Sequence, residues 1–355
     1  MMSSGSFRFG VLLATLASPS AVAGQVSFSA SGHAETPVWS HDGGHIAFEV
    51  NGLSGKVDMY VAAFSGSSSQ GAKKINLPGG ANPFASGSSV SMNAAWHPEG
   101  LVIFEGSNPG GQIRLYYVET TTTQASEMIE TTKLAGDLTF PSVSKDGNSL
   151  LFVADATGNG DIRSRETMGS TLSQITSSPE SELFPAFSPD GKTVVYTRKR
   201  NNTGDIFKVP FNGGESSLVA GGAGDQTRPV FAKDGRIVFF DGARGDNVWD
   251  LASIGASGER VNIARGIRLP TRARPAISHD GEWVAYTYDD PTKAGKVMLS
   301  RVDGSETRSL QTSFEACGEP AFGYQSGKVL LAFTALPDKG SDWRFLYVED
   351  VTDKL

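Results

Sequence analysis

Short apolar segments alternate with polar turns along most of the chain. After a turn glycine, apolar residues often occupy the third and fifth following positions, as Ile46 and Phe48 do after Gly43. A period of two places such side chains on one face of a β-strand. Because no long stretch of the sequence has helical periodicity, the pattern predicts an all-β fold with many tight turns.

One strand–turn–strand unit recurs seven times. In its clearest copy, from Phe184 to Tyr196, Pro185 opens the first strand, Asp190-Gly191 form the turn and an alternating strand follows. Asp-Gly favours a turn because the Asp side chain can bond the local backbone and glycine readily adopts a positive φ. The turn glycines of the seven copies are Gly43, Gly100, Gly147, Gly191, Gly235, Gly281 and Gly327.

The spacing of these glycines indicates the architecture. Their successive separations are 57, 47, 44, 44, 46 and 46 residues, and a four-stranded propeller blade needs about 40–45 residues. Third strands often begin near an Asp such as Asp205, and a shorter fourth strand follows, as at 217–219. The sequence therefore predicts a seven-bladed β-propeller of four-stranded antiparallel blades over residues 24–355. Gly/Ser-rich residues 65–71 and 79–91 are expected to be loop insertions that lengthen the first interval.

The N-terminus supplies a candidate closing strand. The seventh unit ends after its third strand, at residues 345–348, and residues 25–29 precede the first unit as an unassigned strand. Pairing the two would close the ring and cover edges that could otherwise template aggregation. A linear solenoid is the alternative, but it would leave exposed sheet faces at both ends.

The first residues resemble an export signal. Arg8 precedes the apolar run 9–17, and Ala-Val-Ala at 21–23 has the small-x-small pattern of a signal-peptidase site. The run is too short to span a bilayer, and the sequence contains no other candidate transmembrane segment. We expect residues 1–23 to be a signal peptide and the protein to be periplasmic or secreted; a disordered N-terminal tail is the alternative.

Charge and cysteine content exclude several classes of protein. The net charge of −7 and pI near 5.3 argue against a nucleic-acid partner, because no basic field is available to displace phosphate counterions. Cys317 is the single cysteine, so neither an intramolecular disulfide nor a cysteine-built zinc site can form.

The run Pro-x-aromatic-Ser-Pro-Asp-Gly-x-x-apolar-x-apolar, closest to its ideal at residues 185–196, resembles the WD-repeat-like propeller repeat of the TolB family. Related repeats occur in prolyl oligopeptidase-type peptidases and oligogalacturonate lyases, so the resemblance implies a fold more strongly than a function. TolB carries an N-terminal α/β domain before a six-bladed ring, and the peptidases add an α/β-hydrolase domain with a Gly-x-Ser-x-Gly elbow. We find no counterpart of either domain in this sequence and count seven units.

Candidate catalytic groups are few. His41, His97 and His279 fall in or beside the repeat turns, and the recurring aspartates also have a structural cause in those turns. The lyases that resemble this fold use several histidines around a metal, whereas His33 alone cannot make a metal site. We therefore expect no catalytic residue, no metal and no cofactor.

A propeller commonly binds its ligand at one mouth of the channel, where the loops that lead into the innermost strands converge. At these positions the sequence is acidic on the early blades, basic on blades five and six, and acidic again on blade seven. Ordinary polar loops would also account for this mixture, while the arginines could anchor a carboxylate or phosphate. The candidate mouth residues are Glu35, Asn93, Asp137, Phe140, Glu182, Phe184, Asp225, Arg228, Arg272, Arg274, Glu315 and Glu319.

These observations favour an exported, non-catalytic binding propeller, an interaction scaffold that holds a protein or peptide partner at one mouth of the ring. We expect it to be monomeric. The alternative is a carbohydrate- or peptide-active enzyme, of lyase or hydrolase type, with its site in the channel.

Overall fold

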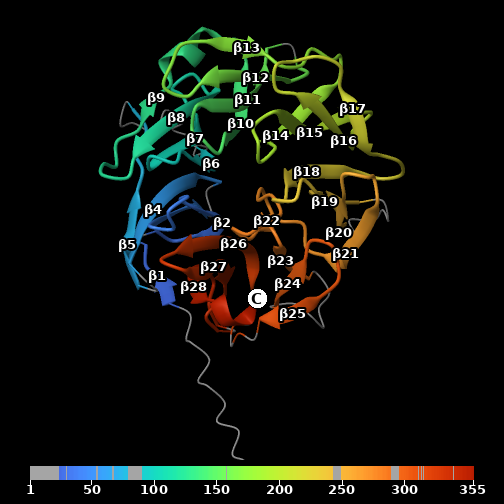
Figure 1. The fold of residues 1–355 in the computed structure, drawn as a ribbon. Coiled ribbons are helices and arrows are strands. Elements are labelled where there is room, and N and C mark those ends of the chain that lie inside the picture. Colours follow the sequence, from blue (N-terminus) through green and yellow to red (C-terminus); the bar gives the residue numbers. More distant parts are fainter. Residues whose placement is uncertain are drawn as a thin grey trace, which may run out of the picture.

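The computed structural model describes residues 24–355 except residues 29, 53–54, 66–67, 79–89, 157, 243–248, 289–295, 311, 313, 315 and 339. In this part of the chain, seven four-stranded antiparallel sheets are arranged in a ring (Figure 1). The arrangement confirms the seven-bladed propeller. The expected signal peptide, residues 1–23, lies outside the described residues.

Each blade begins with the strand that lines the channel and adds its other strands outward. Blades 1 and 2 contain β2 (His33–Trp39), β3 (His45–Asn51), β4 (Val57–Ser65), β5 (Ser68–Lys74), β6 (Ser91–Trp96), β7 (Leu101–Ser107), β8 (Ile113–Glu119) and β9 (Ser126–Glu127). Blades 3 and 4 contain β10 (Asp137–Val143), β11 (Ser149–Asp155), β12 (Asp161–Glu166), β13 (Leu172–Gln174), β14 (Ser181–Phe187), β15 (Thr193–Arg200), β16 (Thr203–Pro210) and β17 (Ser217–Ala220).

The remaining three blades follow the same order. Blades 5 and 6 contain β18 (Gln226–Phe231), β19 (Ile237–Asp241), β20 (Trp249–Ile254), β21 (Arg260–Ile267), β22 (Ala276–Ile277), β23 (Trp283–Thr287), β24 (Val297–Arg301) and β25 (Thr307–Leu310). Blade 7 contains β26 (Gly318–Gln325), β27 (Lys328–Ala335), β28 (Phe345–Asp350) and β1 (Gly24–Val26). Two short 3-10 helices, η1 (Ile129–Lys133) and η2 (Thr352–Lys354), are the helical elements of the described chain.

The repeat turns have the expected chemistry. In blade 4, Asp190 Oδ1 accepts hydrogen bonds from Ser188 Oγ at 2.6 Å and from the Lys192 N–H at 3.1 Å, and Gly191 has φ +70°. Equivalent Ser–Asp bonds recur in the turns of blades 1, 3 and 6. The repeated aspartates therefore stabilise turns, as the sequence indicated.

The inner strands contain a β-bulge that the sequence did not predict. In β2 the register shifts between Glu35 and Val38, around Pro37, and matching shifts occur in β6, β10, β14, β18 and β26. The residue at the bulge has left-handed backbone in each: Thr36, Asn93, Phe140, Phe184, Arg228 and Glu319. The prediction that the proline opens the strand holds in blade 6, where β22 follows Pro275, but is wrong in blades 1, 3, 4, 5 and 7. There the strand begins earlier and the proline occupies the bulge, where its missing N–H breaks no ladder bond.

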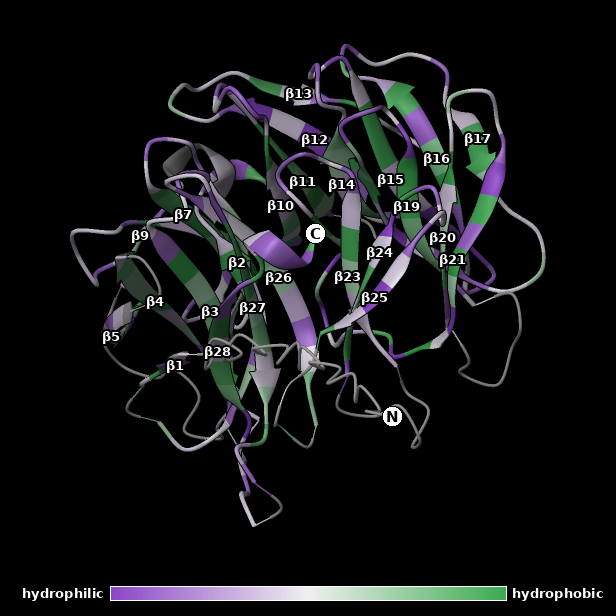
Figure 2. Ribbon diagram, turned by 60° about the horizontal axis from the view of Figure 1, so that its bottom comes forward, coloured by the Kyte–Doolittle hydropathy of each residue, from purple (hydrophilic) through white to green (hydrophobic). Residues whose placement is uncertain are grey.

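Among the described residues, the core consists of seven clusters, each formed between two neighbouring blades. Leu150 and Phe152 of β11 pack with Leu115 of blade 2, whereas Leu151 between them packs with Tyr196 of blade 4. Second strands are therefore apolar on both faces, and Figure 2 shows hydrophobic residues running along the middle strands. The third and fifth positions after the turn glycine share a face, as the period predicted.

The N-terminal strand closes the ring. β1 pairs antiparallel with β28, with Gly24 opposite Val348 and Val26 opposite Leu346 (Figure 1). Val26 is fully buried in a cluster that also contains Phe48 of blade 1. This pairing confirms the predicted closure and excludes the open solenoid.

The first predicted insertion is not a loop. Ser65 ends β4 and residues 68–71 belong to β5, where Phe64 pairs with Ser69 and Ser65 with Ser68, while residues 66–67 lie outside the described residues. Backbone pairing tolerates small side chains on an outer strand, so this Gly/Ser-rich sequence still extends the sheet. Of the second insertion, residues 79–89 lie outside the described residues and Ser91 begins β6. Across the described chain, we find no helix of the length and apolarity that a membrane crossing requires.

Candidate functional site

The segment 268–275, which leads into blade 6, departs from the repeat. β22 is reduced to two residues, and Arg274, which precedes Pro275, lacks the left-handed backbone of its counterparts in the other blades. The carboxylate of Glu319 in blade 7 accepts the Thr271 N–H at 2.7 Å and the Thr36 N–H at 2.5 Å. One buried carboxylate therefore joins the segment to blades 7 and 1.

Arg228 of blade 5 fixes the same segment from the other side. Its Nη1 donates to the carbonyl oxygens of Pro270 at 2.7 Å and Ala273 at 3.0 Å, and its Nη2 donates to that of Thr271 at 3.2 Å. The guanidinium also lies 5.3 Å from the ring centre of Phe184. Burial lowers the pKa of Arg228 to about 10. Its hydrogen-bonding groups are thus used largely within the molecule.

Arg272 spans the channel. Its Nε lies 2.7 Å from Glu49 Oε2 and its Nη2 lies 3.3 Å from Glu35 Oε2, and both carboxylates belong to blade 1, which is not a neighbour of blade 6. Burial alone would lower the pKa of Arg272, but the charges of Glu49 and Glu35 raise it above its ordinary value. These ion pairs fix Arg272 across the ring.

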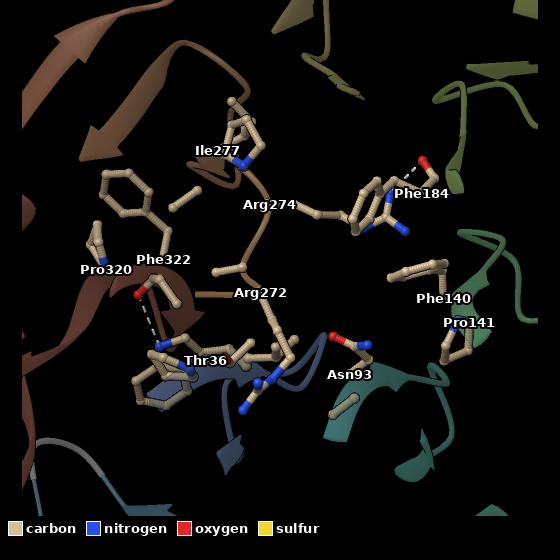
Figure 3. Close-up of a pocket in the computed structure, with 18 residues that line it drawn as sticks. Thr36, Asn93, Phe140, Pro141, Phe184, Arg272, Arg274, Ile277, Pro320 and Phe322 are labelled. Atoms are coloured by element: carbon tan, nitrogen blue, oxygen red, sulfur yellow. Dashed lines mark hydrogen bonds between the residues drawn. The ribbon is translucent and has the colours of Figure 1, made fainter. Parts of the chain in front are cut away.

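Arg274 reaches toward blade 4. Its Nη1 donates to the Phe184 carbonyl oxygen at 2.9 Å, and Figure 3 shows the side chain extended across the channel to that residue. The rings of Phe140 and Phe184 lie beside it, 4.2 Å apart between centres. Burial, followed by the charge of Arg228, lowers the pKa of Arg274 to about 10. Among the described residues, no carboxylate forms an ion pair with Arg274.

Two buried glutamates stand behind Asn93. Glu49 Oε1 accepts the Asn93 N–H at 2.9 Å, and Glu105 Oε1 accepts both Asn93 Nδ2 at 2.7 Å and the Phe140 N–H at 2.6 Å. Burial raises the pKa of Glu49 to about 7 and that of Glu105 to about 8. Each carboxyl group joins its blade to the bulge of the next one.

A pocket of about 250 Å³ lies at the centre of the ring (Figure 3). Six of the seven blades line it: five with residues at the bulge or beyond it along the inner strand, and blade 6 with residues 272–277, most of which precede β22. Its walls are mainly apolar and Arg272 and Arg274 cross it. The lining residues are Thr36, Pro37, Val38, Trp39, Asn93, Ala94, Phe140, Pro141, Phe184, Arg272, Ala273, Arg274, Pro275, Ala276, Ile277, Pro320, Ala321 and Phe322.

Of the twelve predicted mouth residues, the pocket brings together Asn93, Phe140, Phe184, Arg272 and Arg274. The expectation that all twelve precede the first strand is wrong, because the strands begin earlier than the proline suggested. Those that lie within inner strands are Glu35, Asn93, Asp137, Phe140, Glu182, Phe184, Arg228 and Glu319.

The other predicted residues have local partners. Asp137 accepts the Ile113 N–H at 2.9 Å and Asp225 accepts the Gly204 N–H at 2.7 Å. Glu182, which is fully buried, forms an ion pair with Arg198 at 3.0 Å. Glu315 lies outside the described residues.

The sequence reasoning missed Glu49 and Glu105. The sequence does contain a signal for them. Each glutamate follows the aromatic residue of an otherwise apolar second strand, whereas in blade 3 the corresponding residue after Phe152 is the apolar Val153. A charged residue in the middle of a strand buried on both faces requires a partner, and here that partner is the bulge of the next blade.

The histidines lie in structural positions. His97 is buried with its Nε2 2.9 Å from the Gly147 carbonyl oxygen, and the His279 ring stacks on Tyr324 at 4.6 Å. Among the described residues, no group of three or more His, Cys, Asp or Glu side chains is arranged to hold a metal ion.

Comparison with known proteins gives a family and a set of similar folds. A family model described as the TolB beta propeller domain matches residues 10–213. No curated protein matches the sequence. Among solved structures, TolB from Acinetobacter baumannii is 19% identical with a TM-score of 0.57, over 79% of this chain and 67% of that one.

Two enzymes are similarly related in fold. An oligogalacturonate lyase from Vibrio parahaemolyticus is 12% identical with a TM-score of 0.58, over 94% of this chain and 92% of that one. A puromycin hydrolase is 12% identical with a TM-score of 0.62, over 88% of this chain and 53% of that one. At these identities the similarity shows a shared fold and leaves the function to be argued from the site.

Proposed function

This chain belongs to the TolB beta propeller domain family, and from that premise we propose that it is an exported, non-catalytic binding protein that holds a protein or peptide segment in its channel. The observation that carries the proposal is the central pocket, lined by six blades. At about 250 Å³ it is slightly smaller than the sites of drug-sized ligands, so it suits a few residues of an extended chain. The signal-like residues 1–23 support export.

The alternative is a carbohydrate- or peptide-active enzyme with its site in the channel. In its favour, burial raises the pKa of Glu49 to about 7 and that of Glu105 to about 8, as a general acid requires. Against it, both carboxyl groups are almost fully buried and accept hydrogen bonds from Asn93. Their geometry supports a role in holding the channel wall, so binding is the function we favour.

Filling the pocket tests the proposal. Ala273 lines it, and the Ala273→Phe variant should place a ring in the space where a ligand would lie. The mature protein would be used to capture partners from envelope extracts, followed by mass spectrometry. We expect the partner captured by the wild type to be lost from Ala273→Phe. Oligogalacturonate and peptide cleavage would be assayed in parallel.

The matched control is Ala223→Phe, an exposed alanine in the corresponding connection between blades 4 and 5. It adds the same ring away from the pocket and should keep the partner. Capture by Ala273→Phe at the level of the control would contradict the proposal, and so would a cleavage activity that only Ala273→Phe loses.

A further inference from the structure

Arg274 is a cation inside the channel without a counter-ion. Arg272 forms ion pairs with Glu35 and Glu49, whereas Arg228 forms no ion pair among the described residues but donates hydrogen bonds to three carbonyl oxygens. Arg274 has one hydrogen bond, to the Phe184 carbonyl oxygen, and no carboxylate partner among the described residues. A desolvated charge without a partner is unfavourable, so this guanidinium should attract an anion.

Glu105 does not remove the charge of Arg274. Glu105 is the carboxyl group whose field favours the charged form of Arg274, yet burial raises the pKa of Glu105 to about 8, so near neutral pH it is largely protonated. Arg274 keeps its proton there because its own pKa is lowered only to about 10. The pocket therefore carries a net positive charge on Arg274.

The guanidinium faces the pocket with donors to spare. An arginine has five N–H donors in a planar fork, and the Phe184 carbonyl takes one of them. Figure 3 shows the side chain extended through the pocket toward Phe184 and Phe140. A fork of this kind matches a carboxylate with two parallel hydrogen bonds.

The apolar walls of the pocket indicate which chemical group should carry the anion. Phe140 and Phe184 form a tilted aromatic pair, and Pro141, Ile277 and Phe322 add apolar surface around the same space. An apolar group can be buried against these walls while its anionic end meets Arg274. A phosphate monoester carries nearly two negative charges, which the single charge of Arg274 would not balance, whereas a carboxylate carries one.

We propose that the channel pocket is a carboxylate site, in which Arg274 binds the C-terminal carboxylate of a peptide whose last side chain is apolar. This inference rests on the proposed peptide-binding function and names the chemical group that the pocket recognises. The same chemistry is present in a small aromatic acid, which the test separates from a peptide.

The test compares three probes on the mature protein: the tripeptide Ala-Ala-Phe with a free C-terminus, its C-terminal amide, and 3-phenylpropanoate. Binding would be measured by titration calorimetry and by the fluorescence of Trp39, which lines the pocket. The wild type should bind the free peptide at least about tenfold more tightly than the amide, as expected for a lost charge-assisted pair. The free peptide should also raise the melting temperature of the wild type.

Arg274→Met removes the charge and keeps a long apolar side chain. It should bind acid and amide equally, and its melting temperature without ligand should not fall, because a partly buried charge that has no ion-pair partner is lost. Arg274→Lys keeps the charge without the fork and should show a smaller preference for the acid. The matched control, Arg200→Met, changes an exposed arginine at the end of β15 and should keep the full preference.

Equal binding of acid and amide by the wild type, or no binding of any probe at millimolar concentration, would overturn the carboxylate site. So would an Arg274→Met variant that folds and keeps the preference; if it does not fold, an undiminished preference in Arg274→Lys decides the same point. If 3-phenylpropanoate binds as tightly as the peptide and Ala273→Phe still captures its partner, the carboxylate site stands and the proposed peptide-binding function fails. If the acid and the amide bind equally and Ala273→Phe loses its partner, the carboxylate site fails and the proposed peptide-binding function stands.

Discussion

At the residue scale, neighbouring blades are joined by hydrogen bonds in which a side-chain oxygen of one blade accepts the backbone N–H of the bulge residue in the next. Glu105 accepts the Phe140 N–H, and in blade 4 Thr197 Oγ1 accepts the Arg228 N–H at 3.1 Å. A left-handed bulge residue cannot bond within its own ladder, so the neighbouring blade satisfies its N–H instead. The carboxyl groups achieve this at the cost of burial, which appears in their raised pKa values.

Glu105 should make stability depend on pH. Its carboxyl pKa is near 4.5 when unfolded and about 8 when folded, so between these values the folded state binds more protons. This contribution is complete below pH 4.5 and is lost as the pH rises toward 8, at roughly 1 kcal/mol per pH unit. Glu105→Gln keeps an acceptor for both N–H donors, so its stability should change less between pH 5 and 8.

The measurement is the free energy of unfolding in urea at several pH values. Glu99→Gln, an exposed neutralisation in blade 2, serves as the control and should follow the wild type. Parallel curves for Glu105→Gln and wild type would show that Glu105 titrates normally in the folded protein.

The sequence identified Arg274 and the two phenylalanines as channel residues because they stand in phase with the repeat. It could not separate Arg274 from Arg228 and Arg272, because the distinction depends on which acceptors lie within reach across the ring. The sequence predicts Glu319 and Glu35 as ligand contacts, whereas in the structure both carboxylates bond to groups of this chain. Such assignments require the three-dimensional arrangement.

At the element scale, segment 268–275, called the strap below, is held in place by hydrogen bonds with side chains of blades 5 and 7. Arg228→Met removes three hydrogen bonds from a guanidinium to backbone carbonyls of the strap. We expect the free energy of unfolding to fall by about 2–3 kcal/mol and amide hydrogen exchange of residues 268–275 to accelerate. Arg200→Met, an exposed substitution, should leave both unchanged, and unaltered exchange in the strap of Arg228→Met would argue that the carbonyl contacts do not hold it.

Strand number and order followed from the sequence at this scale, but the starts of the inner strands did not. A proline is expected at the start of a strand because it lacks an N–H to donate to the ladder. A bulge inside a strand also leaves a residue whose N–H is not needed for the ladder, so it accommodates proline equally well. The hairpin of β4 and β5 was missed for a related reason: Ser and Gly favour turns locally, whereas pairing with β4 determines the outcome.

At the scale of the whole molecule, stability should depend on ring closure. Deleting residues 25–30 removes β1, exposes the edge of β28 and opens the cluster around Val26. We expect a sharp fall in melting temperature and a tendency to aggregate, measured by calorimetry and light scattering. A chain that begins at Gly24 keeps the strand and is the control; equal melting temperatures for the two would contradict a closing role for β1.

The overall architecture was predictable because the repeat supplies the same information seven times, so a degenerate copy such as that around Gly100 is interpreted from its neighbours. Each core cluster lies between two blades, which is why the second strands are apolar on both faces. The arrangement of the pocket was not predictable, because blade 6 departs from the repeat there.

The pairing of Gly24 with Val348 also sets an order in time. Of the described strands, β1 is synthesised first and its partner β28 last, more than 300 residues later along the chain. Until β28 emerges, the seventh sheet cannot form and the first blade lacks one neighbour. Contacts of such long sequence separation form late and slowly, so the ring should mature only after the whole chain has been made. A protein that crosses a membrane unfolded would reach its destination before its last strand could pair.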